Sequence, residues 1–197
     1  MRTIAAFLFA SLLLIGTANA TPIQWTAGNG HWYDVVWVRT GLSWEDARDM
    51  ADANGGHLVT LNTADENSFV WDFLNDNLVD GTMYKSYWLG ASDVEQEGTW
   101  KWVTDETWES WGDSNWHPGE PNDGIGGPFE GMQDYLHFWE TDSGQWDDMD
   151  NGRHVGGYVV EYEQNPPPVP TPEPSTMLLM GSGLIGLAGF GRKLRKF

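Results

Sequence analysis

The sequence contains no cysteine, and it has few cations outside its two ends. Without thiols the chain cannot form disulfide bonds or zinc–thiolate sites, so its stability depends on packing, hydrogen bonds and any bound metal ion. Five of the 10 Lys and Arg residues lie in the ends, but only one of the 29 Asp and Glu residues does, so the segment between carries 5 − 28 = −23. Such a segment repels nucleic acids and anionic lipids, and we expect no nucleic-acid partner.

The sequence also lacks a long hydrophobic run. The C-terminal stretch from Met177 to Phe190 would span about 21 Å as a helix, against a hydrocarbon core of about 30 Å. A Pro-rich linker precedes it at 165–175, and four cations follow it within 192–197. This order is typical of a stop-transfer segment with a basic cytoplasmic tail. We therefore interpret 176–191 as a transmembrane or sorting helix that contacts the membrane.

The N-terminus, residues 1–20, has the pattern of a secretory signal peptide. Arg2 supplies a positive charge, Ile4 to Ile15 is a run of apolar and small residues, and Ala18-Asn19-Ala20 is a small-x-small cleavage site. The pattern predicts cleavage after residue 20 and export of the remainder. An uncleaved N-terminal anchor is the alternative.

One folded domain remains at residues 21–164, a usual length for a single domain. All 13 tryptophans fall between Trp25 and Trp146, which supplies a hydrophobic core and argues against disorder. The crowded carboxylates of this segment repel one another unless cations neutralise some of them. Bound calcium would do this, although a soluble acidic surface explains the same composition.

Local patterns predict a small α+β domain. Ser43 can cap a helix at 44–53, and Thr63-Ala64-Asp65-Glu66 is a capping box for a second helix through Leu74. A long irregular region follows, from Ala91 to Asn151, and a loop region of that length usually carries function or a metal. Runs of β-branched and aromatic residues predict strands at 32–38, 57–61, 87–90, 99–102, 135–139 and 157–162.

Oxygen-donor side chains gather in the irregular region. Glu120-Pro121-Asn122-Asp123 offers three of them in four residues, and Trp146-Asp147-Asp148 places two carboxylates beside an aromatic ring. Calcium takes about six to eight oxygen ligands, whereas zinc and copper prefer His or Cys. The same residues are also ordinary turn chemistry. The further oxygen donors of this region are Asp93, Glu97, Glu130, Gln133 and Asp134.

The chain resembles the C-type lectin domain over most of residues 25–163. The resemblance implies an α+β fold with two helices, two small antiparallel sheets and a long loop region that binds calcium and sugar. It also implies a binding protein rather than an enzyme. The motifs that carry it follow the family's order and lie near its spacing: Leu42-Ser43-Trp44-Glu45-Asp46-Ala47, Gly56-His57-Leu58-Val59-Thr60-Leu61, Trp88-Leu89-Gly90, Gly119-Glu120-Pro121-Asn122 and Gly144-Gln145-Trp146-Asp147-Asp148.

The resemblance also implies a set of site residues. Glu120 and Asn122 match the family's sugar-binding Glu-Pro-Asn, which goes with mannose- and glucose-type sugars. Asp147 and Asp148 match its Trp-Asn-Asp, with Asp in place of Asn at 147. Gln133 stands where a shared calcium-ligating Glu is usual, and Glu130 is the candidate substitute. The residues that resemble the ligands of an accessory calcium site are Asp93, Glu97, Asp123 and Asp134.

The C-terminal tail resembles the PEP-CTERM sorting signal. Val169-Pro170-Thr171-Pro172-Glu173-Pro174-Ser175 contains the Pro-Glu-Pro core, and the apolar run and basic end follow it. The resemblance implies an envelope protein of a Gram-negative bacterium that is processed by an exosortase-type membrane protease. The mature protein would be anchored at the cell envelope or released into the extracellular matrix.

We predict calcium-dependent binding of a glycan or exopolysaccharide, and two alternatives stay open. Lectin-like domains can keep the fold and bind protein or serve a structural role in the matrix. Glu120 and Asp148 could also act as acid and base on a glycoside, whereas the histidines show no metalloprotease spacing and are interpreted as packing or surface residues. Trp116 and Trp146 are the candidates for stacking on a sugar ring.

Overall fold

The computed structural model describes residues 18–19, 21–77, 86–139, 144–152 and 155–166, which belong to one compact unit. The predicted sorting helix and basic tail, and the predicted signal peptide apart from Ala18 and Asn19, lie outside the described residues. Within the described part of the chain, no helix has the length and apolar character needed to cross a membrane.

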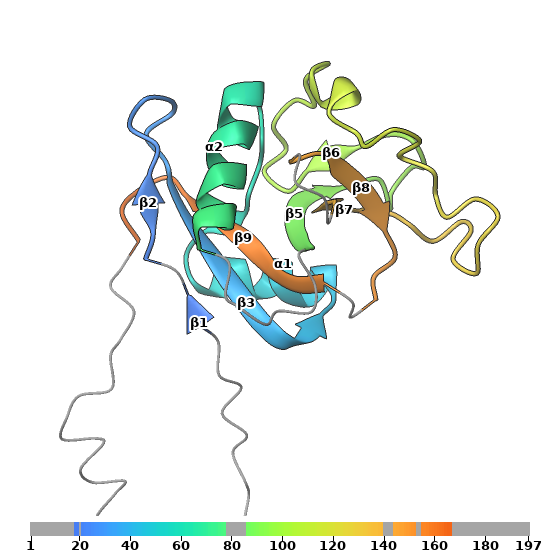
Figure 1. Ribbon diagram of the computed structural model, residues 1–197, viewed down its shortest axis with the longest axis horizontal. Helices are drawn as coiled ribbons and strands as arrows, with labels where there is room; N and C mark the ends of the chain where they lie inside the picture. Colours follow the sequence, from blue (N-terminus) through green and yellow to red (C-terminus); the bar gives the residue numbers. More distant parts are fainter. Residues whose placement is uncertain (1–17, 20, 78–85, 140–143, 153–154, 167–197) are drawn as a thin grey trace, which may run out of the picture. The chain divides into compact units, whose positions relative to one another are not determined.

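Within the described residues, two α-helices and a mixed sheet make up the domain (Figure 1). The helices are α1 (Trp44–Ala53) and α2 (Ala64–Asp76), and a short 3-10 helix covers Gly112–Ser114. The strands are β1 (Ala18–Asn19), β2 (Ile23–Gln24), β3 (Trp32–Leu42), β4 (His57–Leu58), β5 (Tyr87–Ser92), β6 (Lys101–Trp102), β7 (Tyr135–Phe138), β8 (Trp146–Met149) and β9 (Val155–Tyr162).

Both helices begin at the predicted caps. The Ser43 side chain accepts a hydrogen bond from the backbone N–H of Asp46 at 3.1 Å, and Thr63 accepts one from Glu66 at 3.2 Å. These bonds satisfy backbone donors that have no partner inside the first turn. The second helix continues to Asp76, two residues beyond the predicted end at Leu74.

The strands follow the order β1-β3-β9-β5-β7-β8, with β2 paired to β3, β4 to β9 and β6 to β5. The resemblance noted above implies two small antiparallel sheets. In the structure they are joined, because β5 pairs in parallel with β9 at Tyr87–Gly157 and Trp88–Tyr158. Strand β5 therefore connects β6, β7 and β8, which belong to the irregular region, to β9 and β3.

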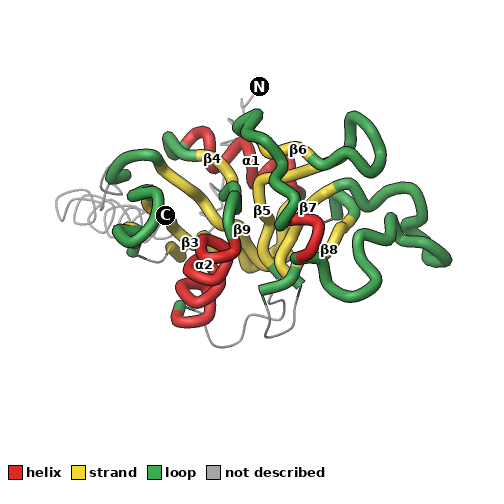
Figure 2. The backbone as a smooth tube through the Cα atoms, turned by 90° about the horizontal axis from the view of Figure 1, so that it is seen from above, coloured by secondary structure: helices red, strands yellow, loops and turns green. Residues whose placement is uncertain are grey.

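Alternation along the central strands explains how the sheet contacts both helices. Tyr33, Val35 and Trp37 of β3 pack in one buried cluster with Val70, Phe73 and Leu74 of α2. Val36 and Val38 pack in a second cluster with Trp44, Ala47 and Ala51 of α1. Successive side chains of a strand point to opposite faces, and Figure 2 accordingly shows β3 and β9 between α1 and α2.

The short strands β1 and β2 are not predicted, β3, β5 and β9 extend beyond their predicted bounds, and β4, β6 and β8 differ most from the prediction. The strand predicted at 57–61 ends at Leu58, because the backbone N–H of Thr60 donates to the Glu161 carboxylate rather than to a neighbouring backbone. The strand predicted at 99–102 covers only its last two residues. Residues 146–149, predicted as loop, form β8 and pair in full register with β7.

Candidate metal centre

The Glu120–Asp123 turn is attached to β8 by one side chain. The two carboxylate oxygens of Asp148 accept hydrogen bonds from the backbone N–H groups of Asn122 at 2.9 Å and Asp123 at 2.6 Å. The Glu120–Pro121 peptide bond is cis. The loop predicted to hold the ligands is thereby placed beside the strand that carries Asp147 and Asp148.

Three carboxylates meet at this junction. Oxygens of Glu120, Asp147 and Asp148 lie within 4.8 Å of one another, and the two aspartates are almost wholly buried. The Oε2 atom of Glu120 is buried and has no hydrogen-bond partner. Burial, and then the charges of Asp147 and Asp148, raise the pKa of Glu120 to about 8. A buried, unpaired acceptor in a group of like charges fits a bound cation.

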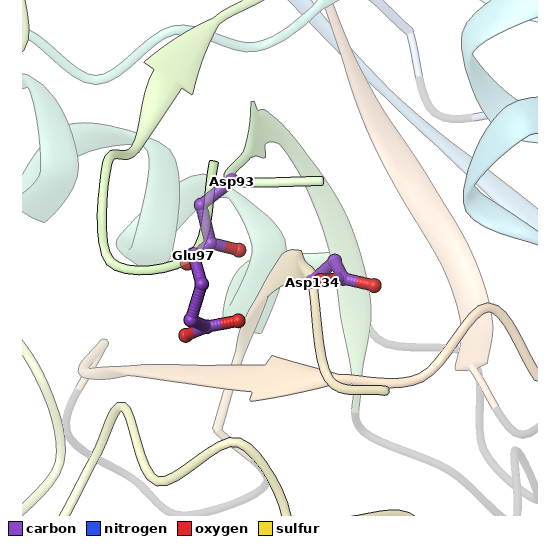
Figure 3. Close-up of side chains that lie close together, drawn as sticks. All are labelled: Asp93, Glu97 and Asp134. Atoms are coloured by element: carbon purple, nitrogen blue, oxygen red, sulfur yellow. The ribbon is translucent and has the colours of Figure 1, made fainter. Parts of the chain in front are cut away.

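A second carboxylate group lies nearby, at the turn after β5. Oxygens of Asp93, Glu97 and Asp134 also fall within 4.8 Å of one another, and Figure 3 shows Asp134 beside the two side chains of the turn. The Oδ2 atom of Asp93 accepts from the backbone N–H of Gly98 at 2.8 Å, whereas its Oδ1 atom is buried without a partner. Burial, followed by the charge of Glu97, raises the pKa of Asp93 to about 6.

The negative charges at one carboxylate group raise the pKa values of carboxylates in the other. The pKa of Glu97 is raised by burial and by Asp123, Asp134 and Asp148, and that of Asp134 is raised by burial and by Asp123 and Asp148. All-oxygen donors in two loop-borne groups suit calcium rather than zinc or copper. The donor chemistry and the unpaired buried oxygens therefore both fit calcium ions.

Other predicted ligands lie at the edge of these groups. The Oδ1 atom of Asn122 accepts from the backbone N–H of Gly124 at 2.7 Å, and Oδ1 of Asp123 accepts from that of Gln133 at 3.1 Å. Glu130, the predicted substitute ligand, does not belong to either of the two carboxylate groups. The loop folds back on itself, and the exposed Glu130 carboxylate accepts from Gly126 at 3.4 Å.

The predicted role of Trp146 and Trp116 in sugar stacking is wrong. Trp146 is fully buried, its Nε1–H donates to Asn67 at 2.9 Å, and its ring contacts that of Trp111 with centroids 5.0 Å apart. Trp116 is only 9% exposed. A side chain enclosed in this way has no free ring face, and both tryptophans serve as core that supports the loops.

Sequence reasoning missed one residue of the site. His137 on β7 lies opposite Asp147 on β8, and its Nε2 atom is 2.9 Å from the Oδ2 atom of Asp147. The histidine is 1% exposed. Its contact with a candidate ligand depends on the register of β7 and β8, and that register could not be predicted while β8 was interpreted as loop.

Comparison with known families gives two matches. The model of the Lectin C-type domain matches residues 40–155, and that of the PEP-CTERM protein-sorting motif matches residues 170–196. The perlucin-like protein of Mytilus galloprovincialis is 33% identical over 120 residues, which are 60% of this chain and 69% of that protein. Human C-type lectin domain family 10 member A is 35% identical over 128 residues, which are 64% of this chain but only 35% of the relative.

Solved structures resemble the domain at low sequence identity. The cow CD23 carbohydrate-recognition domain, solved in the presence of a GlcNAc2Man3 oligosaccharide, has a TM-score of 0.56 and 23% identity, covering 74% of this chain and 95% of that one. The lectin CEL-I of Cucumaria echinata has a TM-score of 0.57 and 22% identity, covering 71% and 95%. A calcium-independent type II antifreeze protein has a TM-score of 0.53 and 20% identity, covering 73% and 95%. At these identities the likeness shows the fold alone.

Proposed function

Because the chain belongs to the C-type lectin domain family, we propose that it is an exported, calcium-dependent carbohydrate-binding protein of the cell envelope. Its family and fold are those of typically non-enzymatic lectins. The ligand that we propose is a mannose- or glucose-type sugar, alone or within an exopolysaccharide. The observation that carries the proposal is the close group of Glu120, Asp147 and Asp148, in which both aspartates are buried and the Oε2 atom of the half-buried Glu120 is enclosed without a partner.

Like charges this close disfavour the metal-free fold. Ionising all three carboxylates in a partly dry site costs free energy, which is why the pKa values of Glu120 and Asp148 are raised. A calcium ion held by Glu120, Asn122, Asp147 and Asp148 would remove the repulsion, with Gln133 beside it. A second ion would be held by Asp93, Glu97, Asp123 and Asp134.

The protein's own groups would select the sugar. Calcium held by these residues would also bind two neighbouring hydroxyls of the sugar. The Glu120 carboxylate accepts hydrogen bonds from such hydroxyls, and the Asn122 amide can both donate and accept. The Asp148 bonds to the Asn122 and Asp123 backbone keep the turn in place before a ligand arrives. This pre-organisation reduces the entropy cost of binding.

A double substitution tests the sugar site. Glu120→Gln with Asn122→Asp reverses the order of acid and amide while keeping the side-chain sizes. We expect mannose-type glycan binding to fall by at least about 10-fold, because bidentate polar contacts are lost, and the unfolding midpoint in chelator to be kept. Unchanged glycan affinity in this variant would place the sugar elsewhere.

The tail supports the cellular part of the proposal. The match to the PEP-CTERM protein-sorting motif at residues 170–196 suggests export and processing by an exosortase-type protease. The product would remain at the envelope or enter the extracellular matrix. Intact-mass measurement of the protein from an exosortase-containing host should give a species that lacks the tail. A full-length C-terminus in that host would refute processing.

A protein-binding or structural role in the matrix is the second candidate. Asp147 and Gln133 depart from the calcium-binding pattern that the resemblance implies. A solved structure of the same fold is described as calcium-independent. Binding to envelope or matrix proteins that persists in chelator, without glycan binding in calcium, would favour this role.

A further inference from the structure

A buried hydrogen-bonded chain leads to one of the carboxylates of the candidate metal centre. The Ser86 hydroxyl oxygen lies 2.6 Å from Nδ1 of His137, and Nε2 of the same ring lies 2.9 Å from Oδ2 of Asp147. Ser86 is 0% exposed and His137 is 1% exposed. Because no substrate can reach a fully enclosed hydroxyl, the Ser-His-Asp arrangement has no part in catalysis here.

The hydrogen-bond partners of His137 indicate which ring nitrogen donates to Asp147. An ionised carboxylate can only accept, so Nε2 of His137 must carry a proton and donate to Asp147. On the other side, Nδ1 lies 2.6 Å from the Ser86 hydroxyl oxygen, which can donate to it, and 2.8 Å from the Phe138 carbonyl oxygen, to which Nδ1 can donate only when it also carries a proton. The ring also meets Trp88 edge to face, with centroids 5.9 Å apart. Contacts on both nitrogens and on the ring fix its orientation.

We propose that His137 is a positioning residue for calcium, an inference that rests on the proposed function. Its Nε2–H holds Oδ2 of Asp147 and leaves Oδ1 as the oxygen available to the ion. Asp147 then presents one oxygen, as the amide of an asparagine would. The Trp-Asn-Asp pattern that the chain resembles has asparagine at this position, so the buried histidine explains how an aspartate can stand there.

The negative charges of the three carboxylates also support a positioning role for His137. Asp147 is 6% exposed and shares the site with Glu120 and Asp148, so water screens the three carboxylates poorly. An N–H donor on Oδ2 draws electron density away from the site and lowers the repulsion within the trio. Partners of metal ligands typically change metal affinity by about 10- to 100-fold when they are removed.

Two amide substitutions at His137 provide a matched test. In His137→Gln the amide nitrogen can reach the place of Nε2 and donate to Asp147, whereas in His137→Asn it reaches only the place of Nδ1. We expect His137→Asn to weaken calcium binding at the Glu120 site by about 10-fold or more. His137→Gln should stay within about three-fold of the wild type.

A double substitution then separates positioning from general damage. In an Asp147→Asn background the donor is no longer needed, so adding His137→Asn should change the calcium affinity by less than about three-fold. Calcium affinity is measured by calorimetry on the full chain. The Asp93–Glu97–Asp134 site serves as an internal control whose affinity should change much less than that of the Glu120 site, and the unfolding midpoint in chelator reports on the fold.

Each outcome is decisive. Equal calcium affinities for His137→Asn and His137→Gln, or equal losses with and without Asp147→Asn, would overturn the positioning role while calcium binding stands. Wild-type protein whose calcium binding is unaffected by Glu120→Gln would instead refute the proposed metal site itself. If His137→Asn does not fold, Ser86→Ala replaces it, because loss of the hydroxyl frees the ring from the far side and should also weaken calcium binding.

Discussion

Replacing Asp34 with asparagine should stabilise the domain at pH 8 and leave its stability unchanged at pH 4. Asp34 lies on β3 opposite Val160 of β9, is 2% exposed, and has a buried Oδ1 atom without a hydrogen-bond partner. Burial raises its pKa from an ordinary 3.8 to about 7. Burial raises the pKa values of Tyr158 and Tyr162 to about 12, and the charge of Asp34 makes a smaller contribution in the same direction.

The size of the effect follows from linkage. The folded protein keeps the Asp34 proton up to about pH 7, whereas the unfolded chain releases it near pH 4. The contribution of Asp34 to the free energy of unfolding is therefore fully present below pH 4 and is lost as the pH rises from about 4 to about 7. At about 1.4 kcal/mol per pKa unit, the loss reaches about 4 kcal/mol at pH 8. Asparagine does not ionise and escapes this loss.

Urea unfolding of both proteins at pH values from 4 to 8, in the same calcium concentration, measures the difference directly. The other carboxylates are present in both proteins, so their titration cancels. Asp52→Asn, at an exposed position of α1, is the control and should show a small difference at every pH. An Asp34→Asn difference that stays flat with pH, or that favours the wild type at pH 8, would refute the reasoning.

Four further predictions concern the core, the caps and the metal. Trp146→Phe should lower the free energy of unfolding by about 2 kcal/mol, through a cavity and the lost bond to Asn67, and leave glycan affinity unchanged; a selective loss of glycan affinity would contradict the buried role. Ser43→Ala should cost about 1 kcal/mol in urea unfolding, because the N-cap bond is lost, whereas no change would mean that the cap is unimportant. Calcium at about 100 times the dissociation constant of one site should stabilise the fold by about 2.7 kcal/mol through that site, seen as a raised thermal midpoint; an unchanged midpoint would contradict binding to the folded state. Glu130→Gln should change calcium affinity by less than about two-fold in calorimetry, and a larger loss would restore Glu130 as a ligand.

Local signals in the sequence predicted the helices and most of the strands. Ser43 and the Thr63–Glu66 capping box mark both helix starts, because an N-cap is decided within four residues. β8 was missed because Asp147 and Asp148 are poor strand formers, and pairing with β7 overrides that preference. The joining of the two sheets was missed for a similar reason, since it depends on the contact of β5 with β9, which are far apart in the chain.

The site residues also divide into those that local motifs predict and those that depend on the folding of distant segments. Glu120, Asp147 and Asp148 could be named from motifs, and the structure brings them together. Glu130 and Trp146 could not be judged from sequence, because nearness along the chain does not decide which way a loop folds or whether a ring is enclosed. His137 was interpreted as a packing or surface residue, since its partner Ser86 is 51 positions away and Asp147 faces it only through strand register.

The most direct test of the account is a calorimetric calcium titration of the purified chain, with Glu120→Gln alongside. The two carboxylate groups predict saturable binding of two ions by the wild type, with one of them lost or strongly weakened in the variant. Absence of binding at millimolar calcium, or binding that Glu120→Gln leaves untouched, would contradict the proposed metal centre.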